Sequence, residues 1–135
     1  RAGLKVDMQS MDWQTLVSRR ARKDPPDKGG WNAFLTSSAA VDIVDPLANT
    51  YINAVGENAW FGWPKDDELL RLRAAFADET DPAKQKELAT AMQVRVSVNP
   101  THGYVGQWYA PVALRKNVTG NLVSPVTIFW NIEKK

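Results

Sequence analysis

Few residues of this 135-residue chain could carry out chemistry. Cysteine is absent, which excludes disulfides, thiolate metal sites and cysteine nucleophiles. The single histidine, His102, would have to serve any catalytic triad. It stands beside Gly103, and no sequence near it resembles the turn that carries a catalytic nucleophile. We therefore interpret it as an ordinary loop or surface histidine. One imidazole without thiolates falls short of a zinc ligand set, so no metal and no other cofactor is expected.

Three consecutive acidic residues, Asp66, Asp67 and Glu68, are the best candidates for acid–base catalysis. They open a stretch with helical spacing, however, and the dipole of a helix favours acidic groups in its first turn. We therefore interpret them as a helix start. The sequence predicts no enzyme.

Charge gives no support to a nucleic-acid partner. The chain has 17 basic and 15 acidic residues, a net charge of +2, which is too small to indicate phosphate binding. Basic residues gather between positions 19 and 28, but Asp24 and Asp27 interrupt them, and the pattern is typical of a solvated face. No apolar run is long enough to span a membrane.

A run of hydroxyl groups is the first candidate for ligand binding. A predicted strand is followed by Thr36, Ser37 and Ser38. Asp42 comes a few residues later, and a predicted helix then starts at Asp45-Pro46. In α/β proteins, ligands gather at the carboxyl ends of strands. Hydroxyls and a carboxylate at such a point are suited to polar groups or an amine.

Tryptophan supplies the second candidate. Six residues in 135 are tryptophan, which suits both cores and ligand pockets. We expect Trp13, Trp108 and Trp130, on patterned elements, to be part of the core. Trp60 and Trp63 stand in a glycine-containing loop, where they could line a cleft.

Helical and strand patterns alternate along the chain, and this mixture indicates the α/β class. Capping residues and 3.6-residue periodicity predict four helices, and alternating apolar residues predict three strands. The predicted helices cover residues 13–23, 45–55, 66–77 and 81–98, and the predicted strands cover 4–8, 31–36 and 126–132. Residues 104–114 are expected to be extended.

Several motifs in this order resemble the C-terminal region of the family 5 extracellular solute-binding proteins, the dipeptide, oligopeptide and nickel-type binding proteins. The resemblance covers essentially the whole chain. The motifs are Trp63-Pro64-x-Asp66-Asp67-Glu68-Leu69, Asp81-x3-Gln85-x2-Leu88-Ala89, Gly106-Gln107-Trp108-x2-Pro111, and Phe129-Trp130-Asn131-Ile132-Glu133-Lys134.

The resemblance implies a fold of two α/β lobes joined by a hinge, with the ligand between them. Residues 1–116 would form part of the second, C-terminal lobe. Residues 117–135 would form the hinge and a tail strand that returns to the first lobe. Because an unpaired apolar strand is a template for association, we expect the tail to pair with another copy or to fold back on itself.

The resemblance also implies a function: an extracytoplasmic, periplasmic component of an ABC importer that captures a peptide-like or other small polar solute and delivers it to the membrane permease. Asp42 falls at the position that holds a peptide ligand's α-amino group. Ser38-Ala39-Ala40-Val41 replaces the family's usual sequence before it, which leaves the ligand open. The opening residues 1–4 show no signal peptide, and we expect the export signal upstream.

Two other functions compete with this one. The Trp60–Trp63 loop could serve a small stand-alone protein-interaction module. A hydrolase is the least favoured reading, since only His102 could act as an imidazole base.

Overall fold

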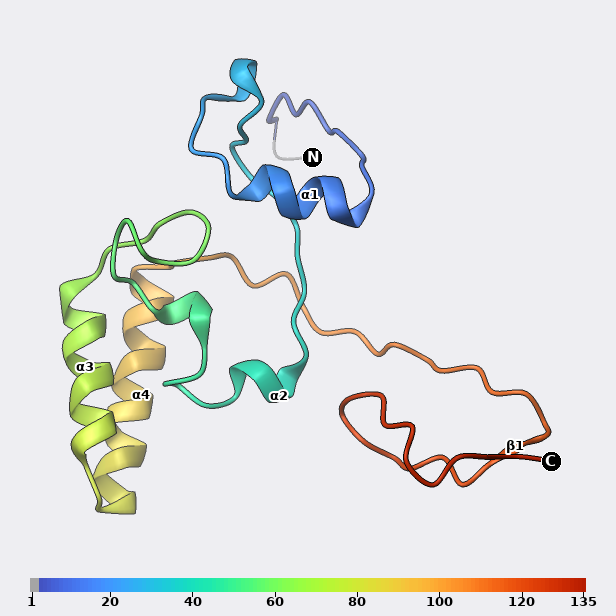
Figure 1. Ribbon diagram of the computed structural model, residues 1–135. Helices are drawn as coiled ribbons and strands as arrows, with labels where there is room; N and C mark the ends of the chain where they lie inside the picture. Colours follow the sequence, from blue (N-terminus) through green and yellow to red (C-terminus); the bar gives the residue numbers. More distant parts are fainter. Residues whose placement is uncertain (1–2) are drawn as a thin grey trace. The chain divides into compact units, whose positions relative to one another are not determined.

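The computed structural model describes residues 3–135 and divides them into two compact units, residues up to Ser37 and Ser38–Lys135 (Figure 1). The expectation drawn from the chain's opening rests partly on Arg1 and Ala2, outside the described residues. Helices are the main regular structure in both units, beside one two-stranded sheet, which is compatible with the α/β class. Within the described part, no helix is long and apolar enough to cross a membrane. The boundary expected at residue 116 concerns a larger protein and stays a prediction.

The first unit is organised around helix α1 (Trp13–Arg20). Asp12 caps it as expected: one carboxylate oxygen accepts a hydrogen bond from the Thr15 backbone N–H at 3.0 Å and the other from the Thr15 hydroxyl at 2.6 Å. Such a cap satisfies backbone donors that the helix itself leaves free. The helix ends three residues earlier than Lys23, where the sequence predicted its end.

The loop after α1 is held by the helix's own basic end. The Arg19 guanidinium donates two hydrogen bonds to the Gly30 carbonyl, at 3.1 and 2.7 Å. The Trp31 indole N–H donates to the Arg20 carbonyl at 3.1 Å. Between them lies the 3-10 turn η1 (Pro26–Lys28). Part of the basic cluster is thus structural and does not simply face solvent.

The two strands predicted in this unit, residues 4–8 and 31–36, do not form. Leu4, Val6 and Met8 alternate as a strand would, but all three are more than 70% exposed. Alternation marks one face for burial, yet a strand also needs a partner to receive its backbone hydrogen bonds. The described residues offer no such partner.

The core of the second unit lies against helices α3 (Asp67–Asp78) and α4 (Pro82–Val98), which pack side by side (Figure 1). Both helices confirm the sequence prediction to within a residue or two, and Asp81 caps α4 ahead of Pro82 as expected. The buried core residues come from both helices and the segment before them. They are Ile52, Ala54, Leu69, Leu72, Met92 and Val96.

The buried carboxylate of Asp66 connects helices α3 and α4. One oxygen accepts the Leu69 N–H at 3.0 Å and so caps α3. The other accepts bonds from the Arg95 guanidinium and the Asn99 amide, both at 2.8 Å, near the end of α4. The bond from Arg95, against the opposing effect of burial, lowers the pKa of Asp66 from 3.8 to about 2. The group therefore stays ionised at neutral pH and ties the start of one helix to the end of the other.

The segment before the helices departs from the prediction. A helix over 45–55 does not form; the chain makes the short helix α2 (Ala40–Ile43) and the 3-10 turn η2 (Thr50–Ile52). Asp45 does cap, but only a single turn: its carboxylate accepts the N–H two residues on at 2.7 Å. The Asn49 side chain then accepts the Tyr51 N–H at 3.0 Å and begins η2. Two successive polar side chains thus divert the backbone from a continuous helix.

The tail folds back on itself, one of the two expected outcomes. Strands β1 (Val118–Thr119) and β2 (Glu133–Lys134) pair antiparallel. The strand predicted over 126–132 does not form, since no strand among the described residues pairs with it, and the chain turns at Asn131, whose φ is +63°. The Asn131 amide donates to the Gly120 carbonyl at 3.1 Å and fixes this turn.

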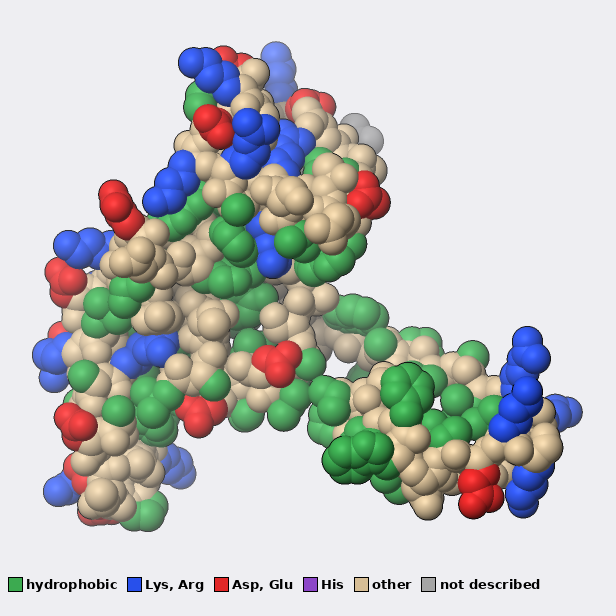
Figure 2. Space-filling view, in the orientation of Figure 1, with side chains coloured by type: hydrophobic (Ala, Val, Ile, Leu, Met, Phe, Trp, Pro, Cys, Tyr) green, Lys and Arg blue, Asp and Glu red, His purple; other side chains and the backbone are tan. Residues whose placement is uncertain are grey.

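Many large apolar side chains remain exposed, most densely on the C-terminal segment (Figure 2). Trp13, Trp108 and Trp130, expected in the core, are 58%, 69% and 78% exposed, so that prediction is wrong. The periodicity of the sequence shows which side chains avoid water but not what covers them. The Arg20 guanidinium lies over the Trp13 ring, 5.6 Å from its centroid, but most of the surface of all three side chains stays open to solvent.

Replacing Asp66 with Asn should lower the free energy of unfolding by about 2 kcal/mol at pH 7, because the Arg95 guanidinium and the Asn99 amide would lose a charged acceptor. Chemical denaturation measures this. Asp67→Asn is the matched control: Asp67 is exposed in the first turn of α3, and its loss should cost only a few tenths of a kcal/mol.

The difference between the wild type and Asp66→Asn should also shrink as pH falls from about 4 to about 2. The folded pKa lies below the unfolded value of 3.8, so the carboxylate's contribution is present above the unfolded pKa and is lost on acidification. Equal stability of the two proteins at pH 7 would contradict this role for Asp66.

Candidate ligand-binding surface

The loop over residues 56–64 is closed at its base. Val55 and Lys65 form an isolated antiparallel bridge, and the Asp66 N–H donates to the Ala54 carbonyl at 3.0 Å. Because Ala54 is fully buried and Asp66 nearly so, the base belongs to the core. The loop is therefore presented from a fixed platform.

The loop carries a tight turn from Trp60 to Trp63, closed by a hydrogen bond from the Trp63 N–H to the Trp60 carbonyl at 2.9 Å. Gly62 has a φ of +103° and Trp63 a φ of +50°. A bulky side chain rarely adopts positive φ, and such strain, on the order of 1–3 kcal/mol, is concentrated at active sites, ligand clamps and switches. The turn is thus a candidate for function as well as for structure.

An aromatic row runs across this part of the unit. It consists of Phe61, Trp60, Tyr51, His102 and Tyr104, in that order. Successive ring centroids are 5.1, 4.6, 5.0 and 4.4 Å apart. The rings come from the loop, from η2 and from the segment after α4, so the row connects three stretches of chain. All but Tyr104 are half-buried, which leaves part of each ring available to a ligand.

The histidine of the row has a defined hydrogen-bonding state. The Thr101 hydroxyl donates its one proton to the Tyr51 carbonyl at 2.7 Å. Its 2.9 Å contact with His102 Nδ1 therefore requires Nδ1 to be the donor. Burial lowers the pKa of His102 from 6.5, which favours the neutral ring. The neutral Nδ1–H tautomer leaves Nε2 as an acceptor.

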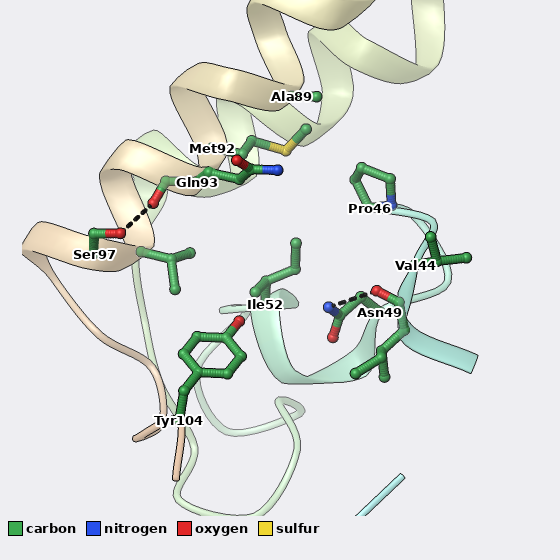
Figure 3. A pocket seen from close by; sticks show the side chains of 11 residues that line it. Val44, Pro46, Asn49, Ile52, Ala89, Met92, Gln93, Ser97 and Tyr104 are labelled. Atoms are coloured by element: carbon green, nitrogen blue, oxygen red, sulfur yellow. Dashed lines mark hydrogen bonds between the residues drawn. The ribbon is translucent and has the colours of Figure 1, made fainter. Parts of the chain in front are cut away.

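A pocket of about 390 Å³ lies beside the aromatic row (Figure 3). Its walls come from α2 and the following turn, from η2, from α4 and from Tyr104. None of its lining side chains is charged. The lining residues are Ile43, Val44, Pro46, Asn49, Ile52, Ala89, Met92, Gln93, Val96, Ser97 and Tyr104.

Two of the predicted site residues join the aromatic row. Trp60 is part of it, and the Ser38 hydroxyl hydrogen-bonds the Tyr51 hydroxyl at 2.6 Å. Trp63 shares the turn with Trp60 and is half-buried. Sequence reasoning had placed Ser38 and the two tryptophans in separate stretches, and Tyr51 is the residue that connects them.

The other predicted residues lie elsewhere. Asp42 is exposed in the short helix α2, immediately before the pocket residue Ile43. Thr36 and Ser37 belong to the first unit, and their part in ligand binding stays a prediction. Among the described residues, no group of three or more metal-ligating side chains comes together.

Sequence reasoning missed Tyr51, Tyr104 and the placement of His102 between them. The position of His102 in a loop was predicted correctly, but its half-buried state was not. A usable signal was present: His102 and Tyr104 stand two residues apart after the helix-ending Pro100, so both side chains can reach one side of an extended chain.

Comparison with known proteins gives one clear similarity. No family model matches the chain. It is 33% identical over 132 residues to a probable peptide ABC transporter periplasmic-binding protein, y4tO, of Sinorhizobium fredii. The match covers 98% of the chain and 25% of that protein, so the chain spans about a quarter of its relative's length. This similarity confirms the resemblance to a stretch of an extracellular solute-binding protein.

Nuclear magnetic resonance of the single histidine tests the geometry of the row. At pH 8, His102 should show the neutral Nδ1–H tautomer, and its titration midpoint should lie below 6.5. Because the unfolded state then takes up its proton at higher pH, the chain should lose stability as pH falls from about 6.5 through the folded pKa.

Thr101→Val is the comparison variant for this measurement. It removes the acceptor for Nδ1–H and should raise the population of the Nε2–H tautomer, while Thr90→Val, on the exposed side of α4, should leave the tautomer unchanged. A wild-type midpoint at or above 6.5, or a dominant Nε2–H form, would contradict the assignment.

Proposed function

We propose, from the confirmed resemblance to the family 5 extracellular solute-binding proteins, that this chain forms part of the ligand-binding lobe of an ABC importer's solute-binding component. The relative's name, a probable peptide ABC transporter periplasmic-binding protein, supports a peptide-like solute and a periplasmic location. The other small polar solutes of such importers remain alternatives. The role is capture and release, without catalysis.

The observation that carries this proposal is the contact of the Ser38 hydroxyl with the Tyr51–Trp60 ring pair, in the same stretch of chain as an exposed carboxylate. The Ser38 hydroxyl, the Tyr51–Trp60 ring pair and the exposed Asp42 all belong to this stretch. Aromatic rings offer apolar area and an attractive face to cations. A carboxylate pairs with an ammonium group through charge-assisted hydrogen bonds. Together they suit the amino end of a peptide.

The mechanism that follows is clamping. The ligand would bridge this lobe and a second one, and would favour the closed arrangement by contacting both at once. The permease in the membrane would then recognise the closed form. In this scheme residues 1–116 contribute to the second lobe, whereas residues 117–135 act as hinge and tail strand to the first.

The exposed apolar side chains of the tail support its assignment to another lobe. Val123, Phe129 and Trp130 are each more than 75% exposed, and an apolar surface of this kind is typical of an interface. The same surface would allow the isolated chain to associate with a second copy. Strands β1 and β2 are each only two residues long. The tail can therefore give up this short pairing and pair with a longer strand of another lobe.

The alternative, an interaction module built on the Trp60–Trp63 loop, is favoured only by the strained φ of Trp63. The Trp60 ring packs against both Tyr51 and Phe61. Those contacts leave only part of each ring exposed, which is enough to contact a small ligand but a small area for a protein partner. The loop is therefore better suited to forming one wall of a ligand site.

Replacing Asp42 with Asn tests the ligand's amine contact in the longer protein that contains this chain. Affinity for a tripeptide with a free amino terminus should fall about 10- to 100-fold, the loss expected for one charged hydrogen bond. Isothermal titration calorimetry measures it, and native mass spectrometry identifies any peptide that the wild type retains from expression.

Asp78→Asn, at the far end of α3, is the matched control and should leave affinity unchanged. An amino-acetylated tripeptide should bind the wild type and Asp42→Asn equally weakly. If Asp42→Asn keeps full affinity for the free-amine peptide, the residue has no part in the site. If no peptide binds the wild type, peptide capture itself is wrong.

A further inference from the structure

The pocket beside the aromatic row has a chemical character of its own. Its base is apolar, formed by Ile52, Met92 and Val96. Two polar side chains of the wall already have partners in the fold: the Asn49 amide donates to the Ile43 carbonyl at 3.1 Å, and the Ser97 hydroxyl donates to a carbonyl of its own helix at 2.8 Å. The Asn49 amide and the Ser97 hydroxyl therefore shape the wall of the pocket, and the protons in these two bonds are not available to a ligand.

Two other polar groups keep hydrogen-bonding capacity at the opening. Within the described residues, neither the Gln93 side-chain amide nor the Tyr104 hydroxyl has a hydrogen-bond partner. The Gln93 side chain extends from α4 toward Pro46, and the hydroxyl end of Tyr104 points toward Ile52 (Figure 3). One donor–acceptor amide and one phenol beside an apolar base match a peptide unit that carries an apolar side chain.

The pocket also lies between the two parts of the proposed ligand surface. Ile43 follows Asp42 directly in α2, so the two Cα atoms are about 3.8 Å apart. On the other side, Tyr104 is both a pocket residue and the last ring of the aromatic row. A ligand whose amine reaches Asp42 is therefore within one residue's length of the pocket.

We propose that this pocket receives an uncharged, mainly apolar side chain of the bound peptide, while Gln93 and Tyr104 hydrogen-bond the adjoining peptide unit. The inference rests on the proposed function and adds a specificity to it. A volume of about 390 Å³ lies at the lower end of ligand pockets, which suits one side chain and not a whole peptide.

Selectivity against charge follows from the lining. Since no lining residue is charged, a lysine or glutamate side chain would lose hydration in the pocket without gaining a counter-charge, and that loss is unfavourable. An apolar side chain loses no such hydration and gains contact with Ile52, Met92 and Val96. The pocket would thus select among peptides by charge at one position.

A panel of tripeptides tests this with the longer protein. Ala-Leu-Ala should bind at least about tenfold more tightly than Ala-Lys-Ala or Ala-Glu-Ala in calorimetry, a difference of about 1.4 kcal/mol. All three share a free amine, so the contact with Asp42 is held constant while the pocket's occupant changes.

The Gln93→Glu variant tests whether this pocket, and not another part of the protein, determines the preference. Gln93 is exposed on α4, so the fold should tolerate the change, and the new carboxylate stands at the opening. We expect affinity for Ala-Leu-Ala to fall about tenfold and affinity for Ala-Lys-Ala to rise, which narrows or reverses the preference. Gln14→Glu, the same substitution on α1 in the other unit, should change neither affinity.

The outcomes separate the two proposals. If the wild type binds none of the tripeptides, peptide capture and this inference both fail. If it binds all three equally, or if Gln93→Glu leaves the preference intact, only the pocket's role is overturned. If Gln93→Glu lowers the melting temperature without altering the preference, another segment of the polypeptide fills the pocket and the inference is wrong.

Discussion

The buried carboxylate of Asp66 is the constraint on which the second unit depends. One oxygen accepts the Leu69 N–H in the first turn of α3, and the other accepts hydrogen bonds from two side-chain donors at the end of α4. A buried charge is tolerated only when its hydrogen bonds are complete. Since one donor belongs to α3, one to α4 and one to the residue that follows α4, the requirement fixes where α3 begins relative to where α4 ends. The apolar core can then pack in one arrangement.

The candidate binding surface follows from that arrangement. The same residue, through its N–H, holds the base of the loop that presents Trp60 and Trp63. Helix α4, held at its end by Arg95 and Asn99, supplies one wall of the uncharged pocket. The chain that leaves α4 then brings His102 and Tyr104 against Tyr51. The side chains of the candidate surface thus come mainly from connecting segments that are anchored on the packed pair of helices.

Local signals predicted what local chemistry determines. The caps at Asp12 and Asp81 and the two long helices were predictable from the sequence, because a cap needs only its own first turn. The strands were not, since Leu4–Met8 and 126–132 require partners that periodicity cannot reveal. The aromatic row was not predicted for a related reason. Its rings are up to 53 positions apart in the sequence, and only tertiary packing brings them together. Of the candidate site, Ser38 and Trp60 were named from the sequence as separate candidates, while their link through Tyr51 was not predictable.

Hydrogen–deuterium exchange of the longer protein, with and without saturating Ala-Leu-Ala, tests the central claim most directly. A ligand that binds this surface should slow exchange in residues 40–52, 59–64 and 101–104, while the first turns of α4, distant from the pocket lining, should exchange at an unchanged rate. Protection confined to other parts of the protein, or no protection at all while the peptide is bound, would contradict the assignment of the ligand-binding surface to this chain.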